Sequence, residues 1–302
     1  MLNLHLRRTR AILATGMAAA LAVGILSAGQ AVLAAGTSTV GLGTAAPFAI
    51  LAGTPAITNT GSSTITGNVG IDPAAAVTGF PPGKINGTTH AADAVAVKAK
   101  SDLTAAYGDA AGRVSTATHG TLGGLTLVAG VYNAGGTTLG LTGTLTLDAK
   151  NNKNAVWIFQ ATSDLVTASS STVRVINGGQ ACNVFWQVTS SATLGSGSTF
   201  VGTIMALTSI TMASGVTVNG RALARNGEVT LINDRITRPT CKAATATASP
   251  VAPLMTQAPT DTVVAADAHG ADGLPVLLLL VGVFIAVMLI AVRRPVRTTR
   301  NR

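Results

Sequence analysis

The side chains that most often carry out catalysis are sparse and scattered in this sequence. Its histidines are His5, His90, His119 and His269, and acidic residues in its middle part include Asp148, Asp164, Glu228 and Asp234. A catalytic or metal centre needs such groups gathered with a nucleophile, a base or further ligands. No histidine has such a partner nearby in the sequence, and the acidic residues form no calcium-binding cluster. We therefore expect no catalytic residue, no metal site, no cofactor and no enzymatic activity.

Two cysteines are present, Cys182 and Cys241. An even number of cysteines in an exported chain favours a disulfide. The bridge would close a loop of roughly 60 residues, which the chain-entropy model values at about 4 kcal/mol. The alternative is a reactive or metal-bound thiolate, but no His, Asp or further Cys stands at ligand spacing.

Hydroxyl groups recur at a regular spacing between residues 183 and 234. Thr193, Thr211 and Thr230 lie in similar tripeptides, 18 and then 19 residues apart. A strand-like tripeptide at that interval suggests a chain that coils round an axis, with one turn per repeat. Successive turns would place the threonines about 4.7 Å apart, which is the strand spacing of a sheet. Such a rigid, flat array of methyl and hydroxyl groups can order water into an ice-like pattern and dock on a crystal. Threonine is also a favoured strand residue, so the row could instead be purely structural.

The composition agrees with a regularly layered protein. The 302 residues are 47% hydrophobic, but only 3% are aromatic and 10% are charged, whereas about a quarter of a typical chain is charged. The net charge of +9 is concentrated at the two ends, where eight of the 20 basic residues lie. The remaining 12 basic residues nearly balance the 11 acidic ones. Since both basic clusters flank apolar segments, they are typical of membrane topology signals, and we expect no nucleic-acid partner.

Short strands are expected to position the hydroxyl groups. Phe48–Ala52 is typical of a buried strand, and further strands are expected at Leu125–Leu127, Thr144–Leu147, Val156–Phe159 and Val173–Ile176. Residues 155–159 align with residues 183–187 at an offset of 28, whereas Thr172 and Thr199 align at 27. Because the intervals vary, the coil is expected to be irregular.

One helix is expected, from Thr88 to Gly112. Thr88 or Thr89 can cap its start, Asp93 favours its first turns, and Gly112 can end it. Val95, Leu103 and Tyr107 should lie near one face of this helix, with several alanines between them. Small residues on that face would let the helix lie close against a sheet.

The two ends of the chain have the character of export and anchoring segments. Residues 1–35 combine a basic start, an apolar run and small residues at a cleavage position, which predicts a signal peptide, with an uncleaved anchor as the alternative. Residues 242–274 form an Ala/Thr/Pro-rich linker. Residues 275–292 form an apolar run that is long enough to cross a membrane, which takes roughly 17–25 residues. The basic residues 293–302 should stay in the cytoplasm. The folded domain, residues 36–241, would then lie outside the cell, at a bacterial cell surface.

Several blocks of the sequence resemble the ice-binding-like family, the DUF3494 type of ice-binding or antifreeze protein. They are Gly67–Gly70, Asn183–Gln187, Phe200–Ala206 with Thr208–Thr211, and Val218–Ala224, and the similarity runs from about Phe48 to Cys241. The resemblance implies a mostly β fold, an irregular three-sided right-handed β-solenoid with one long helix alongside. It also implies adsorption to ice, which would result in freezing-point depression, inhibition of recrystallisation or ice adhesion. We expect the protein to be a monomer.

The resemblance also indicates which residues would contact ice. Active members often carry a Thr-Ala/Gly-x-Thr/Asn pattern, and Thr167–Ser170 comes close but ends in serine. The expected ice-binding face contains Thr167, Ser169, Ser191, Thr193, Ser209, Thr211 and Thr230. Arg221 and Glu228 are expected to bring charge near the later strands, so the regular face should end close to Glu228. The alternative functions are a surface adhesion module that binds a polysaccharide or another cell and, less favoured because acidic residues are sparse, a carbohydrate-active enzyme.

Overall fold

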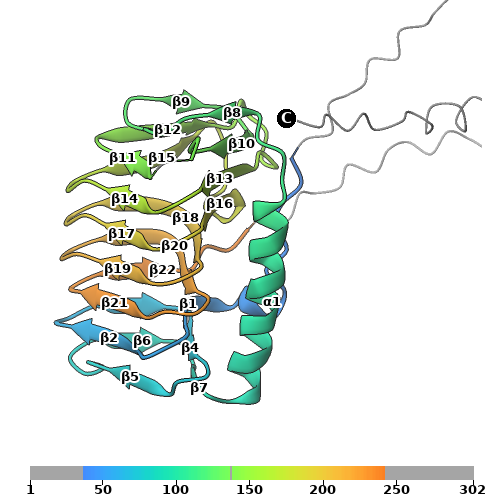
Figure 1. The fold of residues 1–302 in the computed structure, drawn as a ribbon. Coiled ribbons are helices and arrows are strands. Elements are labelled where there is room, and N and C mark those ends of the chain that lie inside the picture. Colours follow the sequence, from blue (N-terminus) through green and yellow to red (C-terminus); the bar gives the residue numbers. More distant parts are fainter. Residues whose placement is uncertain (1–36, 137, 242–302) are drawn as a thin grey trace, which may run out of the picture. The chain divides into compact units, whose positions relative to one another are not determined.

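A computed structural model describes residues 37–136 and 138–241 of the chain. In this region, parallel strands coil into three stacks that run side by side, and one helix lies along one of the stacks (Figure 1). The fold is therefore mostly β with parallel sheets and one helix, as expected. The expected signal peptide, linker, transmembrane segment and basic tail all fall outside the described residues. Within the described residues, no helix combines the length and hydrophobicity that crossing a bilayer requires.

The stack next to the helix is called the helix face. It contains β8 (Ala117–Thr118), β10 (Gly130–Asn133), β13 (Trp157–Ala161), β16 (Val184–Val188), the second halves of β18 (Thr199–Ala206) and β20 (Thr217–Ala224), β1 (Phe48–Ala52), β4 (Asn68–Ile71) and β7 (Thr89–Ala91).

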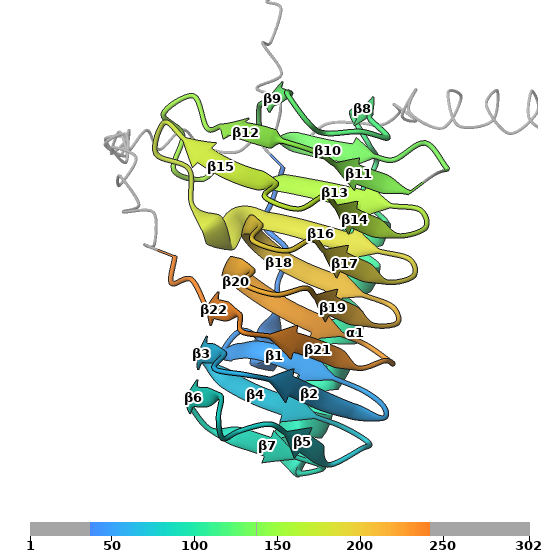
Figure 2. The same cartoon turned by 90° about the vertical axis from the view of Figure 1, so that its left-hand side faces the viewer.

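The second stack is a separate seven-stranded sheet, here called the threonine face. In spatial order it contains β11 (Leu139–Leu141), β14 (Leu165–Thr167), β17 (Ala192–Leu194), β19 (Ile210–Met212), β21 (Val229–Ile232), β2 (Ala56–Thr60) and β5 (Ala76–Thr78). Figure 2 shows β14, β17, β19, β21 and β2 one below another.

The third stack is called the arginine face, after the exposed Arg174 and Arg235 on it. It contains β9 (Thr126–Leu127), β12 (Thr144–Asp148), β15 (Thr172–Ile176), the first halves of β18 and β20, β22 (Arg235–Thr237), β3 (Thr64–Thr66) and β6 (Lys84–Asn86). The long strands β18 and β20 run through both the arginine face and the helix face, which joins these two stacks into one 15-stranded sheet.

Two segments of the chain build the coil and meet in its interior. The first turns, from β1 to β7, lie at one end of the coil, and the helix returns the chain to the other end, where β8 begins (Figure 1). The later turns then coil back until β20, β21 and β22 pair with β1, β2 and β3. Strands far apart in the sequence are therefore neighbours at this junction.

The helix α1 spans Ala94–Ala111 and is shorter at its start than expected. Residues Thr89–Ala91 instead form β7, which pairs with β4, and the Asp93 side chain caps the helix by accepting a hydrogen bond from Ala96 N at 2.8 Å. Strand pairing thus takes Thr88 and Thr89 away from the helix. The buried side of α1 consists of Ala96, Ala99, Leu103, Ala106, Tyr107 and Ala110. Val95, expected on that side, is 47% exposed.

Aromatic rings from successive turns stack inside the coil. Phe159 lies between Tyr132 and Trp186, with ring centroids 5.5 Å and 4.1 Å away, and Trp186 also contacts Phe200 at 4.8 Å. Few aromatic residues are present, but these four follow one another along the axis, so the narrow core is filled from turn to turn.

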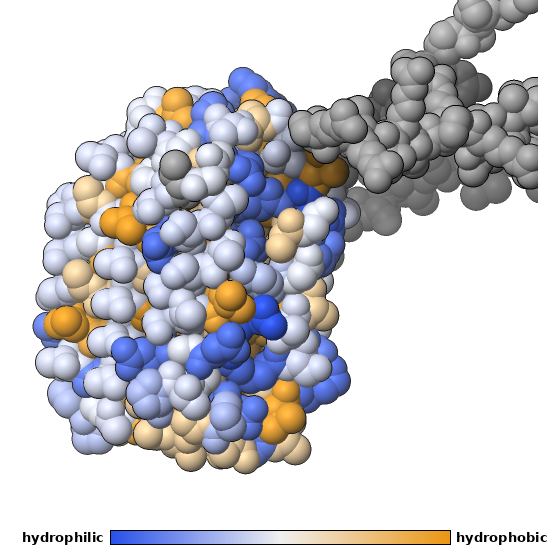
Figure 3. Space-filling model, in the orientation of Figure 1, coloured by the Kyte–Doolittle hydropathy of each residue, from blue (hydrophilic) through white to orange (hydrophobic). Residues whose placement is uncertain are grey.

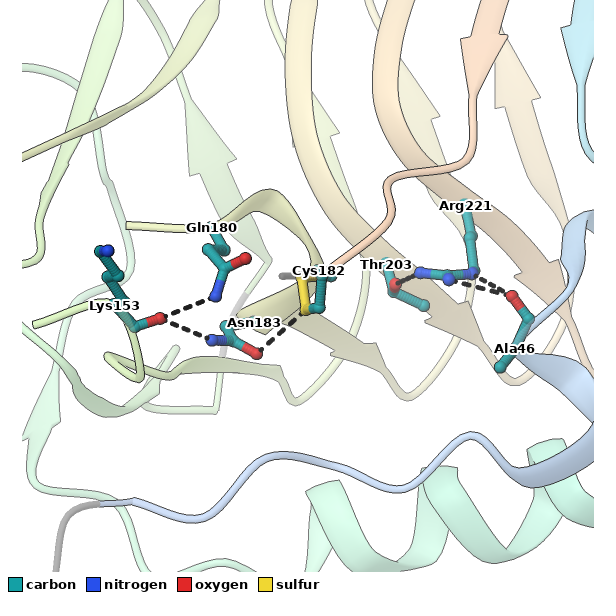
Figure 4. Close-up of a disulfide and its surroundings, with 8 residues drawn as sticks. Ala46, Lys153, Gln180, Cys182, Asn183, Thr203 and Arg221 are labelled. Atoms are coloured by element: carbon teal, nitrogen blue, oxygen red, sulfur yellow. Dashed lines mark hydrogen bonds between the residues drawn. A yellow bond between two sulfur atoms is a disulfide. The ribbon is translucent and has the colours of Figure 1, made fainter. Parts of the chain in front are cut away.

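The register of β13 and β16 differs from the expected alignment. Trp157 pairs with Val184 and Phe159 with Trp186, an offset of 27 residues in place of 28. The Thr172–Thr199 alignment at 27 is confirmed. Cys182 and Cys241 form the expected disulfide, with Cα atoms 5.8 Å apart, and it ties the 3₁₀ turn Ala181–Asn183 to the segment after β22 (Figure 4).

Candidate functional site

A continuous row of threonines crosses the threonine face. Strand pairing aligns Thr193 with Thr211, Thr211 with Thr230, Thr230 with Thr58, and Thr58 with Thr78. Neighbouring strands of a sheet are about 4.8 Å apart, so five hydroxyl and methyl groups repeat at this interval. The expected ladder of Thr193, Thr211 and Thr230 is thus present in the strand register.

Alternation along each short strand turns these side chains outward. In β17 and β19 the central threonine is exposed, while the residues on both sides of it are fully buried: Ala192, Leu194, Ile210 and Met212. Burying these apolar neighbours fixes which side of each strand faces the core. The orientation of the threonines is therefore set by the core and is rigid.

Two of the threonines in the row were not among the expected residues. Thr58 and Thr78 belong to the first turns of the coil and extend the row past Thr230. The expectation that the regular face ends near Glu228 is therefore wrong. The alternating threonines from Thr58 onward are visible in the sequence, but only the pairing of β2 with β21, 172 residues apart at Thr58 and Thr230, places them in this row.

Thr167 does not belong to the row, because its side chain points into the protein. It is only 4% exposed, and its Oγ1 accepts a hydrogen bond from Gly195 N at 2.9 Å and lies 3.3 Å from Ser198 Oγ. The outward position on β14 is occupied by Val166, which pairs with Thr193. Ser169 is exposed in the turn after β14, beyond the strand that carries the row. The expected contact role of Thr167 is thus contradicted by its burial.

Ser191 and Ser209 each stand two residues before the threonine of the following strand, and they form a second column of hydroxyl groups beside the threonine row. Backbone hydrogen bonds from Leu165 N to Ser191 O and from Ala192 N to Ser209 O join the turns at this level, each at 3.0 Å. Ser191 Oγ also lies 2.7 Å from Thr208 Oγ1. The Ser191 hydroxyl is therefore held in place by Thr208, and the two serines form a border to the row.

Charged groups occur at the border of the threonine face and not in its central row. Asp164 accepts a hydrogen bond from Ser191 N at 3.0 Å, and this bond lowers the pKa of Asp164. Glu228 lies in the same flanking column, because Ile210 N donates to its carbonyl oxygen. Arg221, expected to bring charge to this region, is 5% exposed and donates to Ala46 O on the far side of the coil.

The arginine face carries a second set of aligned threonines. Thr144 pairs with Thr172, Thr172 with Thr199, and Thr199 with Thr217. The same column then continues with Arg235, Thr64 and Lys84, and Arg174 stands in the adjacent column. Basic side chains therefore interrupt this second array, whereas the five-threonine row has no ionisable member.

The surface over the threonine face, as seen in Figure 3, is mostly of intermediate hydropathy. In the view of Figure 3, the part of the molecule where Figure 1 places β14, β17, β19 and β21 is mostly pale, with isolated apolar residues. Within the described residues, no group of three or more His, Cys, Asp or Glu side chains could hold a metal ion. The geometry of the threonine face is suited to ordered contact with a flat, hydrated surface.

Comparison with known proteins places this chain in a family. The model of the ice-binding-like family matches residues 50–237, which include the whole five-threonine row. An ice-binding protein of Nostoc sp. (strain HG1) is 46% identical over 198 residues, covering 65% of this chain and 72% of the relative. An ice-binding protein of Flavobacterium frigoris (strain PS1) is 36% identical over 219 residues, covering 66% and 76%. The crystal structure of an ice binding protein from an Antarctic biological consortium aligns with a TM-score of 0.66 at 43% identity, covering 68% of this chain and 93% of that one.

Proposed function

Since this chain belongs to the ice-binding-like family, we propose that it binds ice without catalysis, as a monomer, through the threonine face. The single observation that carries the proposal is the in-register row Thr193, Thr211, Thr230, Thr58 and Thr78. The consequence would be freezing-point depression, inhibition of ice recrystallisation or adhesion to ice.

A row of this kind can bind a crystal because both partners are periodic and rigid. Each threonine offers a methyl group and a hydroxyl group, and buried residues on both sides hold four of the five in position, Thr78 at the end of the row being the exception. Little conformational entropy is then lost when water molecules between the row and the crystal become ordered. Repetition over five strands adds many weak contacts into one stable attachment.

The threonine face suits this role better than the arginine face. Ammonium and guanidinium groups hold their own hydration shells, whose geometry differs from that of an ice lattice. Arg174, Arg235 and Lys84 would impose such shells on the arginine face, whereas the central row of the threonine face has no charged member. Glu228 and Asp164 stand at its border and limit its width.

Bulky substitutions on the two faces test the proposal. We would express residues 36–241 and compare T193Y/T211Y with T199Y/T217Y in thermal hysteresis and recrystallisation assays. All four threonines are exposed, and each pair is aligned on neighbouring strands, so the two variants are matched. A tyrosine ring would stand above the hydroxyl groups and hold the flat row away from the crystal. We expect T193Y/T211Y to lose most of the activity and T199Y/T217Y to retain it.

Two outcomes would count against this assignment. If the unmodified domain behaves like an inert protein of the same size at micromolar concentration, ice binding is wrong and the adhesion function becomes the better hypothesis. If T199Y/T217Y loses activity while T193Y/T211Y keeps it, ice binding stands but the arginine face is the contact surface.

The apolar and basic segments at the chain ends support a membrane-anchored location outside the cell. In this proposal, residues 1–35 are removed as a signal peptide, residues 275–292 cross the membrane and residues 293–302 stay inside. Ending the chain after residue 274 should move the protein from the membrane fraction into the medium. Recovery of the unmodified chain in the medium, or of the shortened chain in the membrane, would contradict the anchor.

A further inference from the structure

A shallow cavity of about 540 Å³, widely open to solvent, lies away from the threonine face, beside the disulfide. Its walls come from the entering segment at residues 39–47, from β16 and β20, and from the segment that follows β22. The apolar part of the lining includes Val40, Leu42, Pro47, Phe185 and Pro239. This volume falls within the range of small-molecule sites, roughly 300–1,000 Å³, and such sites combine apolar walls with a few polar groups.

The first polar group is the guanidinium of Arg221, which is only 5% exposed. Its Nε and one terminal nitrogen donate to Ala46 O at 3.1 and 2.9 Å, and the other terminal nitrogen donates to Thr203 Oγ1 at 3.2 Å (Figure 4). A guanidinium has five N–H groups, so these bonds leave one on each terminal nitrogen. Both acceptors are neutral, so they do not balance the positive charge.

The second polar group is Arg238, which lines the same cavity. Its Nε is buried and has no hydrogen-bond partner in the structure. Burial, and after it the neighbouring charge of Arg238, lower the pKa of Arg221 to about 10. The four ion pairs found among residues 37–136 and 138–241 involve neither arginine.

Two buried or partly buried cations without a counter-charge are costly, because an unpaired charge loses its hydration without compensation. An anion between them would remove this cost. A carboxylate fits best, because a guanidinium binds its two oxygens through two parallel hydrogen bonds. The apolar walls favour a ligand with a hydrocarbon body over a small, strongly hydrated inorganic anion.

We propose that this cavity is a binding site for a small organic carboxylate, held by Arg221 and Arg238 with its hydrocarbon part against the apolar walls. The site does not depend on the threonine face. Occupation would join the entering segment to the segment after β22 and so stabilise the region where the disulfide already links the chain.

Hexanoate is a suitable probe, because it carries one carboxylate on a short hydrocarbon chain. We would titrate it into the full-length chain in a non-ionic detergent by calorimetry and follow the melting temperature. We expect saturable binding with one site per chain and a rise in melting temperature. Hexanamide has nearly the same shape without the charge and should bind at least ten times more weakly. This difference corresponds to about 1.4 kcal/mol of binding free energy.

Arg238→Gln tests the residue assignment, because Arg238 makes no ion pair whose loss would disturb the fold. We expect R238Q to weaken hexanoate binding at least tenfold, whereas R174Q, which removes an exposed arginine from the arginine face, should leave it unchanged. Equal binding of hexanoate and hexanamide, absence of saturable binding, or an R238Q affinity equal to that of the unmodified chain would each overturn the proposal. Because ice assays report on another face, these outcomes are separate from those for ice binding.

Discussion

Asp234 is a buried acid whose protonation should couple stability to pH. It is 2% exposed, and its two carboxylate oxygens accept hydrogen bonds from Val216 N and Ile232 N, each at 2.7 Å. Burial raises its pKa to about 6 despite these bonds. Between the unfolded value of 3.8 and about 6, the folded protein therefore binds more protons than the unfolded chain.

The free energy of unfolding should consequently fall as pH rises from about 4 to about 6 and then stay level, because stability decreases wherever the folded state binds more protons. The expected loss is on the order of 2 to 3 kcal/mol, since each pKa unit corresponds to about 1.4 kcal/mol. Urea unfolding at several pH values would measure it. In D234N this dependence should disappear, and an unchanged slope in D234N would assign it to another group.

Which side a single hydroxyl faces was only partly predictable from the sequence. The 18- and 19-residue spacing placed Thr193, Thr211 and Thr230 correctly, because the same alternation with buried neighbours repeats in each turn. The local motif at Thr167 was misleading, because β14 places Leu165 and Thr167 inward and Val166 outward. A strand of three residues has no long pattern from which its phase could be read, and a shift of one residue reverses every side chain.

At the scale of the elements, the paired glycines Gly202 and Gly220 determine how β18 and β20 pass from the arginine face to the helix face. The two are aligned in register, Gly202 has a φ of 116°, and a Cβ on Gly220 would overlap the carbonyl oxygen of Gly202. A side chain on Gly220 would push β18 and β20 apart, and a Cβ on Gly202 would overlap Trp186 and Val184 of the neighbouring strand β16. The bend therefore depends on both residues lacking one.

The substitution G220A should lower the free energy of unfolding by about 1–3 kcal/mol, the usual cost of adding a group to a fully packed site. Gly108 offers a matched control in α1, because a Cβ there would meet no atom within 4 Å. The same change, G108A, should raise stability by about 0.5–1 kcal/mol, since alanine is the better helix residue. Urea denaturation would compare the two variants, and equal effects would contradict a special role for the Gly202–Gly220 contact.

The sequence predicted the existence of elements better than their ends and pairings. The helix and the strand Phe48–Ala52 were found because their patterns are local, but the start of α1 depends on the pairing of β7 with β4. The alignment of residues 155–159 with 183–187 matched similar aromatic residues and was wrong by one. Core stacking sets the actual register by placing Phe159 against Trp186.

At the scale of the whole folded region, the chain builds one surface from two separate segments. β21 belongs to the last turn and β2 to the first turns, yet they align through Thr230 and Thr58. The spacing of repeats could predict the later segment by itself. It could not predict the junction, because a contact across 172 residues leaves no periodic trace in the sequence.

This junction makes a specific prediction about Thr58. If both segments form one ice-contact row, T58Y should reduce thermal hysteresis as strongly as T211Y, although the two positions are far apart in the sequence. The double variant T58Y/T211Y should be little worse than either single variant, because one protruding ring already separates the rigid row from the crystal, and such effects are not additive. T66Y is the matched control, since Thr66 is exposed in the same early turns but on the arginine face, and it should retain activity. Normal hysteresis in T58Y, together with loss in T211Y, would confine the contact surface to the later turns.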